Sequence, residues 1–515
     1  MLASLKNRIG INPLAWLQDT WRMRQIVRQF DTRPDRTAPG LRFVVVITPW
    51  VGSTVPWLSL GIGLLLARHA SPVTFVIDDL PFGRHPLRYA FVLRCIRFVA
   101  AALRAGHRVV DLSSLPSNAA AAAQAGPTIE TLARLNAVWE MRGEKPSSAH
   151  EAFAALCTSQ LMRAYGPIAS VLRPGSADVM FVPGGVYGNS GLWVFHARKA
   201  GMRIATYDNG GSGALMLAVN GIASQMQDIP AAFRTLQARC QDPQELAFVV
   251  EEARHELQQR RAGVDVFAYQ IPGSASVDNR FDGAVLIALN SSWDSAALGL
   301  HTVFRDNQDW IVETTRFLLA HTGLTVIVRQ HPAERMAYAR SNDDYADMLV
   351  RNFGNHPRLQ FIAAEEKINS YDLLDRVAAV VVYTSTIGVE AAAYGKPVIT
   401  PSNSYYSGLG FVHRAANLDD YQAQLASIGT GALAVTDTMR QDAMLCYYVT
   451  QVCNWVFSPF NPAEFHVWSR IGLDRLQVDA KIRGLVRALQ DNVPIATLNH
   501  QDRFAARDHG TAPAT

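Results

Sequence analysis

Two short segments place polar and charged side chains where they could hold a phosphate group. The first is Arg329-Gln330-His331-Pro332-Ala333-Glu334, which follows an apolar run. The planar guanidinium of Arg329 and the imidazole of His331 are both hydrogen-bond donors suited to phosphate oxygens. The alternative is a surface loop whose polar residues have no common function.

The second segment is Thr384-Ser385-Thr386-Ile387-Gly388-Val389-Glu390, which also follows an apolar run. Its three hydroxyls precede a predicted helix, whose free N–H groups and dipole favour an anion. Gly388 would permit a close approach to the backbone, and Glu390 could accept hydrogen bonds from a ribose diol. Alternatively, the hydroxyls only cap the helix and Glu390 completes a capping box.

Two further loops are candidates for contact with a sugar or an acceptor. Residues 405–411 are rich in glycine and tyrosine, so Tyr405, Tyr406 and Gly408 could close over a sugar or base. In the first half of the chain, Ser53 and Thr54 belong to a glycine-bearing loop that we expect to face the acceptor. The alternative for both segments is a packed loop without a ligand.

Carboxylates at strand ends could act as a general base toward a hydroxyl that lies within hydrogen-bond reach. Asp208, which precedes Asn-Gly-Gly-Ser-Gly, and Asp294 are the main candidates. Asp208 could instead begin an Asx turn. Asp78 and Asp79, at the end of another apolar run, are less favoured candidates.

Ten short apolar runs alternate with helical patterns and would position these residues. The runs are 43–48, 73–78, 108–111, 178–183 and 203–207 in the first half, and 284–290, 324–330, 359–363, 378–383 and 397–400 in the second. Nearly continuous apolar strands separated by helices indicate parallel sheets covered on both faces. Two sets of five predict two doubly wound α/β domains, with ligands at the carboxyl ends of the strands.

The predicted organisation has five parts, divided in the middle by a Gly/Ser/Asp-rich segment at 272–283. They are a basic N-terminal segment (1–40), an acceptor domain (41–270), a nucleotide-sugar domain (280–440), C-terminal helices (441–497) and a disordered tail (498–515). The N-terminal segment has five basic residues before position 30, and its apolar residues include Leu14, Trp16 and Leu17. It could dock on an anionic membrane or pack as a helix on the domain.

Composition excludes several classes of protein. A net charge of +4 over 515 residues argues against a nucleic-acid partner. The five cysteines are odd in number and scattered, which indicates reduced thiols in the cytoplasm and no zinc site. Residues 43–67 carry no charge, but Pro49, Gly52 and Pro56 interrupt them, so we predict a strand and a buried helix rather than a membrane span. We expect neither a metal nor a cofactor.

The order of these motifs resembles the nucleotide-binding half of GT-B enzymes. More closely, residues 290–411 resemble the bacterial capsule and surface-polysaccharide biosynthesis family, which includes the capsule Kdo transferases. The matching segments are Asn290-Ser291-Ser292-Trp293-Asp294-Ser295-Ala296, Trp310-Ile311, Arg329-Gln330-His331-Pro332-Ala333-Glu334, Ser370-Tyr371-Asp372-Leu373, the stretch from Tyr383 to Glu390, and the loop 405–411. One departure is that Val412 and His413 follow Phe411, where members of the family often continue Gly-Phe-Thr.

The resemblance implies a GT-B fold, with two Rossmann-like domains facing a central cleft. It also implies that His331 and the hydroxyls of residues 384–386 contact the phosphate of a nucleotide sugar. The expected activity is glycosyl transfer to a capsule polysaccharide or lipid-linked glycan, in the cytoplasm or at the inner face of the membrane. The alternatives are a GT-B-like sugar-nucleotide epimerase or polyol-phosphate polymerase, and a non-catalytic nucleotide-binding assembly protein.

Overall fold

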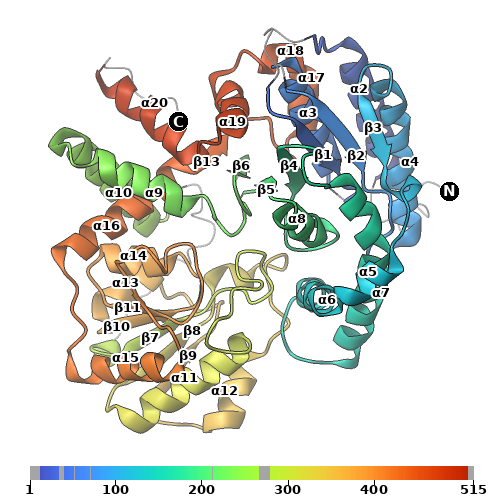
Figure 1. Cartoon of the computed structure of the whole chain (residues 1–515). Coiled ribbons are helices and arrows are strands. Elements are labelled where there is room, and N and C mark those ends of the chain that lie inside the picture. The colour runs from blue at the N-terminus through green and yellow to red at the C-terminus, as the bar shows by residue number, and fades with distance from the viewer. Residues whose placement is uncertain are drawn as a thin grey trace. The chain divides into compact units, whose positions relative to one another are not determined.

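All ten apolar runs contain strands in the computed structural model, which describes residues 12–33, 40–50, 53–69, 71–210, 213–265 and 279–508 (Figure 1). The chain forms two α/β units. Unit 1 contains the described residues up to Ala137 together with Ala149–Asp228 and Trp455–Asn499. Unit 2 contains Val138–Ser148, Ile229–Asn454 and the described residues from His500 onward.

This division differs from the predicted boundary near 272–283, since it falls between Asp228 and Ile229. The physical reason lies in two helices, α9 (Ile229–Arg239) and α10 (Pro243–Ala262). Both pack on α16 (Asp437–Tyr447), and α10 also packs on the π-helical turn η6 (Tyr448–Cys453), so they belong to unit 2. Residues 266–278, which include most of the predicted linker, lie outside the described residues.

The sheet of unit 1 has seven strands in the order β13-β6-β5-β4-β1-β2-β3. The strands are β1 (Phe43–Ile47), β2 (Val73–Ile77), β3 (Arg108–Asp111), β4 (Val179–Pro183), β5 (Arg203–Asn209), β6 (Ala214–Ala218) and β13 (Trp455–Phe457). β6 is antiparallel to β5 and β13. The sequence did not predict β13, which forms one edge of this sheet, or β6, which lies next to it.

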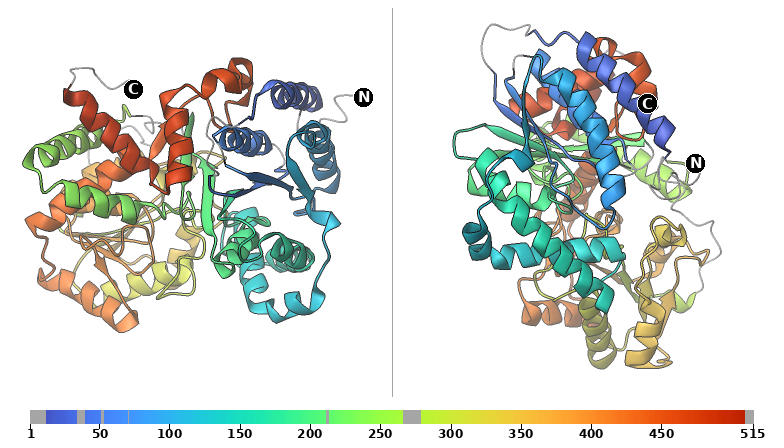
Figure 2. Two further views of the ribbon diagram at one scale, coloured as in Figure 1. Left: turned by 45° about the horizontal axis from the view of Figure 1, so that its top comes forward. Right: turned by 90° about the vertical axis from the view of Figure 1, so that its right-hand side faces the viewer.

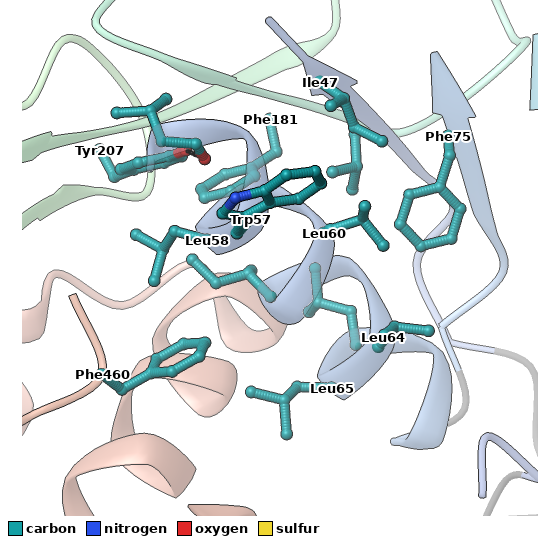
Figure 3. Close-up of a cluster of buried hydrophobic side chains, with 14 of the residues drawn as sticks. Ile47, Trp57, Leu58, Leu60, Leu64, Leu65, Phe75, Phe181, Tyr207 and Phe460 are labelled. Atoms are coloured by element: carbon teal, nitrogen blue, oxygen red, sulfur yellow. Dashed lines mark hydrogen bonds between the residues drawn. The ribbon is translucent and has the colours of Figure 1, made fainter. Parts of the chain in front are cut away.

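The helices of unit 1 cover this sheet and include segments from both ends of the chain (Figure 2). They are α2 (Pro13–Gln29), α3 (Val55–Arg68), α4 (Pro86–Leu103), α5 (Ala119–Gln124), α6 (Gly126–Met141, which continues into unit 2), α7 (Ser148–Val171), α8 (Ser190–Lys199), α17 (Phe465–Ile471), α18 (Leu473–Leu476) and α19 (Ala480–Asp491). In Figure 3, Trp57 and Leu60 of α3 lie among Phe75, Phe181 and Phe460. The charge-free stretch is therefore a strand and a buried helix, as predicted. Among the described helices, none combines the length and hydropathy that a membrane crossing requires.

The sheet of unit 2 has six parallel strands in the order β12-β11-β10-β7-β8-β9. The strands are β7 (Val285–Ala288), β8 (Val326–Arg329), β9 (Leu359–Ile362), β10 (Ala379–Val382), β11 (Val398–Thr400) and β12 (His413–Arg414). The helices are α9, α10, α11 (Asn307–His321), α12 (Tyr345–Phe353), α13 (Ser370–Arg376), α14 (Ile387–Ala393), α15 (Leu418–Thr430) and α16. The strand order runs outward in both directions from β7 and β10, which is the doubly wound arrangement. The predicted fold class is thus confirmed for each unit, while the central cleft stays a prediction.

The C-terminal region corrects two expectations. Residues 455–499 pack with unit 1 rather than after the second sheet, because β13 pairs with β6. The predicted tail from residue 498 is instead part of α20 (Ile495–Asp508). Buried His500 bonds Glu245 of α10, and the Phe504 ring lies 5.4 Å from that of Phe248, so the segment has a packed face. Residues 509–515 lie outside the described residues.

Candidate functional site

A pocket of about 400 Å³ lies in unit 2 where the strand order reverses. Residues that follow β7, β8 and β10 line it, together with the start of α13 and Arg260 of α10. A topological switch point is where open α/β sheets bind ligands. The pocket brings together seven of the predicted site residues: Asp294, Arg329, His331, Thr384, Ser385, Thr386 and Glu390.

His331 is held in one orientation by the turn that it begins. It is the N-cap of the short 3-10 helix η5 (Pro332–Arg335), and its Nδ1 accepts the Ala333 N–H at 3.2 Å. Burial, assisted by the charges of Arg260 and Arg329, lowers the pKa of His331 to about 4. A neutral ring whose Nδ1 accepts must carry its proton on Nε2. His331 can therefore offer the pocket a neutral N–H donor.

Arg329 lines the pocket, but most of its N–H groups donate to backbone carbonyls. Its Nη1 and Nη2 atoms donate to the carbonyls of Ala363 and Ile368, the latter at 3.1 Å. Burial lowers the pKa of Arg329 to about 10. Its Nε has no hydrogen-bond partner among the described residues. The guanidinium thus fastens the segment after β9 to β8, and its charge acts on the pocket through space.

Arg260 is a pocket residue that the sequence analysis missed. Its side chain is partly buried, and its guanidinium nitrogens lie 2.8 Å from an oxygen of Asp265 and 4.0 Å from an oxygen of Glu390. Arg260 stands near the end of a polar helix, and nothing in its local sequence distinguishes it from a surface residue. Only the packing of α10 within unit 2 brings it to the pocket.

Glu390 lies in the wall of the pocket, and its contacts test the prediction that it completes a capping box. It is 4% exposed, hydrogen-bonds with Tyr371 and faces Arg260. Burial raises its pKa, and Arg260 opposes that shift. Thr386, the N-cap of α14, makes no side-chain capping bond. The capping box is therefore absent here, because Glu390 is engaged on Tyr371 and Arg260.

Gly388 and the tyrosine loop pack behind α14 rather than lining the pocket. A Cβ at Gly388 would lie only 2.6 Å from the Tyr406 hydroxyl, and that hydroxyl donates to the Ser385 carbonyl at 2.8 Å. Tyr406 is fully buried. None of Gly388, Tyr405, Tyr406 and Gly408 is among the lining residues. The absence of a side chain at Gly388 therefore makes room for Tyr406 rather than for a ligand. The tyrosine loop supports the start of α14 on the side away from the pocket.

The predicted carboxylates fall in different units. Asp294 is exposed, lines the pocket and accepts the Ala296 N–H at 3.1 Å in an Asx turn. Asp208 lies in unit 1, within β5 and opposite Met216 of β6, because the strand continues beyond its predicted end into a hairpin. Asn209, expected in a glycine-rich loop, thus belongs to β5, and residues 211–212 of that loop lie outside the described residues.

The remaining first-half candidates also lie in unit 1. Thr54 donates to the Pro462 carbonyl, and Ser53 accepts the Val55 N–H at 3.2 Å, so both support the start of α3. Asp78 and Asp79 are buried. Asp78 accepts from Asn189 and Trp193, both at 3.0 Å. These contacts give Ser53, Thr54 and Asp78 structural partners within unit 1.

Behind the pocket, Glu334 joins the segments that follow β7 and β8. Its carboxylate accepts from Gln330 at 2.9 Å and from Ser291 at 3.2 Å, while burial raises its pKa to about 7. Among the described residues, no three His, Cys, Asp or Glu side chains are grouped as a metal site requires. The expectation of a reaction without metal or cofactor stays a prediction.

Residues 274–446 match the family model described as capsule polysaccharide biosynthesis protein. This segment is therefore similar to that family over about a third of the chain. It contains every pocket-lining residue except Arg260. The predicted resemblance is therefore confirmed for residues 274–446, which carry most of the pocket.

Other similarities are weaker. Protein FixF of Sinorhizobium fredii (strain NBRC 101917 / NGR234) is 27% identical over 164 residues, which are 32% of this chain and only 38% of FixF. A beta Kdo 2,4 transferase structure, KpsC of Thermosulfurimonas dismutans, has a TM-score of 0.36 at 16% identity, covering 53% of this chain and 80% of KpsC. A putative UDP-N-acetylglucosamine 2-epimerase of Listeria monocytogenes has a TM-score of 0.26 at 11% identity, covering 88% of this chain and 97% of the epimerase. Because both TM-scores are low, only the family match bears on function.

Proposed function

We propose that this protein is a glycosyltransferase that moves a sugar from a nucleotide-sugar donor to a capsule polysaccharide or another cell-surface glycan. The observation that carries the proposal is the pocket at the switch point of unit 2, which lies almost wholly in the capsule-family segment. Such a pocket suits a nucleotide. The family supports a polysaccharide or lipid-linked glycan as acceptor, on the cytoplasmic side of the membrane.

In this proposal the donor phosphate lies between the His331 turn and the hydroxyls of residues 384–386. The Nε2–H of neutral His331 and the hydroxyls donate to phosphate oxygens, and Arg260 and Arg329 supply positive potential from the walls. These groups would stabilise the charge that develops on the leaving nucleotide. The proposal needs neither a metal nor a cofactor.

The acceptor hydroxyl must lose a proton, and Asp294 is the exposed carboxylate of the pocket. Asp208 of unit 1 is retained as the second candidate. The matched variants are Asp294→Asn and Asp208→Asn, since an amide can still accept the backbone N–H that each carboxylate accepts now. Loss of the base should lower kcat by roughly 10²–10⁴-fold and leave nucleotide affinity unchanged. If neither variant loses turnover, the base is elsewhere.

Product analysis with a panel of nucleotide sugars and glycan acceptors tests the reaction itself. Transfer predicts a lengthened glycan and one released nucleotide per sugar added. An epimerase would change the free sugar nucleotide without an acceptor, and a polyol-phosphate polymerase would form phosphodiesters. Binding of nucleotide without any turnover would favour an assembly protein and overturn the proposed transfer.

A further inference from the structure

Two neighbouring helices of unit 1 leave large apolar side chains exposed to solvent. On α2, Trp16, Met23 and Ile26 are buried, whereas Leu14, Leu17 and Trp21 are exposed, the last to 60%. The exposed three are spaced by three and four residues, so they form one stripe along the helix. Trp16 is a core residue, so this side of the helix packs on the domain, which is one of the two arrangements expected from the sequence.

Two arginines extend this stripe toward the end of α2. Arg24 and Arg28 follow Trp21 at the same three- and four-residue spacing. The outer side of α2 is therefore apolar in its first half and basic in its second. Asp19 is the only acidic residue of the helix, and it lies 3.7 Å from Arg22.

Helix α4 extends this surface. It packs beside α2, and the two helices lie together in Figures 1 and 2. Arg24 lies over the ring of Phe98 at 3.9 Å and donates to its carbonyl, while Thr20 hydrogen-bonds with Cys95. The helices therefore run in the same direction.

The outer side of α4 also carries exposed apolar side chains and an arginine. Leu87 is 69% exposed, Phe98 is 47% exposed, and Arg94 lies between them on the same side of the helix. Of the six arginines in the two helices, Arg22 pairs with Asp19 and Arg97 pairs with Asp79, whereas Arg28 and Arg94 are exposed on the outer side. The outer surface of the two helices is consequently both apolar and basic.

We infer that the outer stripes of α2 and α4 form a docking surface for an anionic lipid bilayer. Exposed Trp and Leu would enter the interfacial region, where Trp is favoured. The arginines would meet anionic headgroups, which supplies the charge complementarity that a neutral surface lacks. The inference does not depend on the proposed reaction, because these residues lie outside the pocket.

Cosedimentation of the full chain with lipid vesicles tests this inference. We expect binding to vesicles of phosphatidylglycerol and phosphatidylcholine, little binding to phosphatidylcholine alone, and release at 1 M salt, where the screening length falls to about 3 Å. Each arginine near an anionic membrane surface contributes about 1 kcal/mol to binding, which is roughly a fivefold change in the partition coefficient. The double variant Arg28→Gln/Arg94→Gln should therefore bind roughly 25-fold more weakly.

The apolar stripe is tested separately by Leu17→Gln/Trp21→Gln, for which we expect at least a tenfold loss. Val350→Gln and Arg414→Gln, at exposed positions of unit 2, are matched controls that should bind as the unaltered protein does. All of these side chains are exposed, so a common melting temperature should show that each variant folds. Absence of binding to anionic vesicles, or equal binding by the stripe variants and the controls, would overturn the inference.

Discussion

Asp78 of unit 1 is a buried carboxylate whose ionisation should affect stability. Burial raises the pKa of Asp78 to about 6, against opposing hydrogen bonds from Trp193 and Asn189. Between about pH 4 and pH 6 the folded state keeps a proton that the unfolded state has lost, so stability falls as pH rises. Above pH 6 both states are ionised, and the accumulated cost is about 3 kcal/mol.

We therefore expect Asp78→Asn to stabilise the protein at pH 7.5 and to flatten the stability profile between pH 4 and pH 6. The new amide keeps the Trp193 N–H on its own oxygen, and its NH2 can donate to Asn189 Oδ1 once the Asn189 amide turns over, because that oxygen has no hydrogen-bond partner among the described residues. Urea unfolding followed by tryptophan fluorescence at several pH values measures both effects. Asp79→Asn is the control and should destabilise, since Asp79 pairs with Arg97 at 2.7 Å. An unchanged pH profile in Asp78→Asn would refute this account.

At this scale the sequence predicted much of the pocket. His331 and the hydroxyls of residues 384–386 could be found because each follows an apolar strand, and the carboxyl ends of parallel strands meet at one edge. Arg260 could not, since its position depends on how α10 packs. Gly388 was assigned to ligand contact, because the sequence does not show that Tyr406 fills the space beside it.

Among the elements, α20 is the one that sequence reasoning described least well. His500 Nε2 lies 2.7 Å from the carboxylate of Glu245, and His500 Nδ1 lies 3.1 Å from the Tyr448 hydroxyl. We predict that His500→Ala lowers the free energy of unfolding by about 2–4 kcal/mol, because it leaves a cavity and removes two buried hydrogen bonds. Thermal denaturation measures the loss.

The matched control is His466→Ala, which removes an exposed histidine 3.8 Å from Glu464. An exposed pair contributes little, so this variant should change stability by less than about 0.5 kcal/mol. Equal melting temperatures for the two variants would mean that α20 does not stabilise unit 2.

The strands were predicted far better than this helix. Their nearly uninterrupted Val and Ile content reflects burial on both faces, which is a local signal. The edge strand β13 has only three residues and is defined by its pairing with β6, while β6 is apolar but contains no Val or Ile. The polar composition of residues 498–508 did not reveal a helix with one packed face.

At the scale of the whole molecule, the chain passes between the two units several times. Unit 1 needs its C-terminal segment: Phe465 lies against Trp57 with ring centroids 6.2 Å apart, and Phe460 and Trp468 fill the space at Gly61. We predict that a fragment of residues 1–228 aggregates, because this apolar surface would be exposed. Joining residues 455–499 to it through a Gly/Ser linker should restore solubility and a cooperative thermal transition. A soluble, cooperatively folded 1–228 fragment would contradict this account.

The central claim is that the pocket of unit 2 binds a nucleotide. Calorimetric titration of the full chain with a panel of nucleoside mono- and diphosphates tests it most directly when His331→Ala is compared with His356→Ala. Both histidines accept a backbone N–H two residues ahead at 3.2 Å, but only His331 lines the pocket. We predict that at least one nucleotide binds the unaltered protein, that His331→Ala weakens its binding roughly tenfold or more, and that His356→Ala leaves it unchanged. No binding by any nucleotide, or the same affinity in both variants, would contradict the assignment of this pocket.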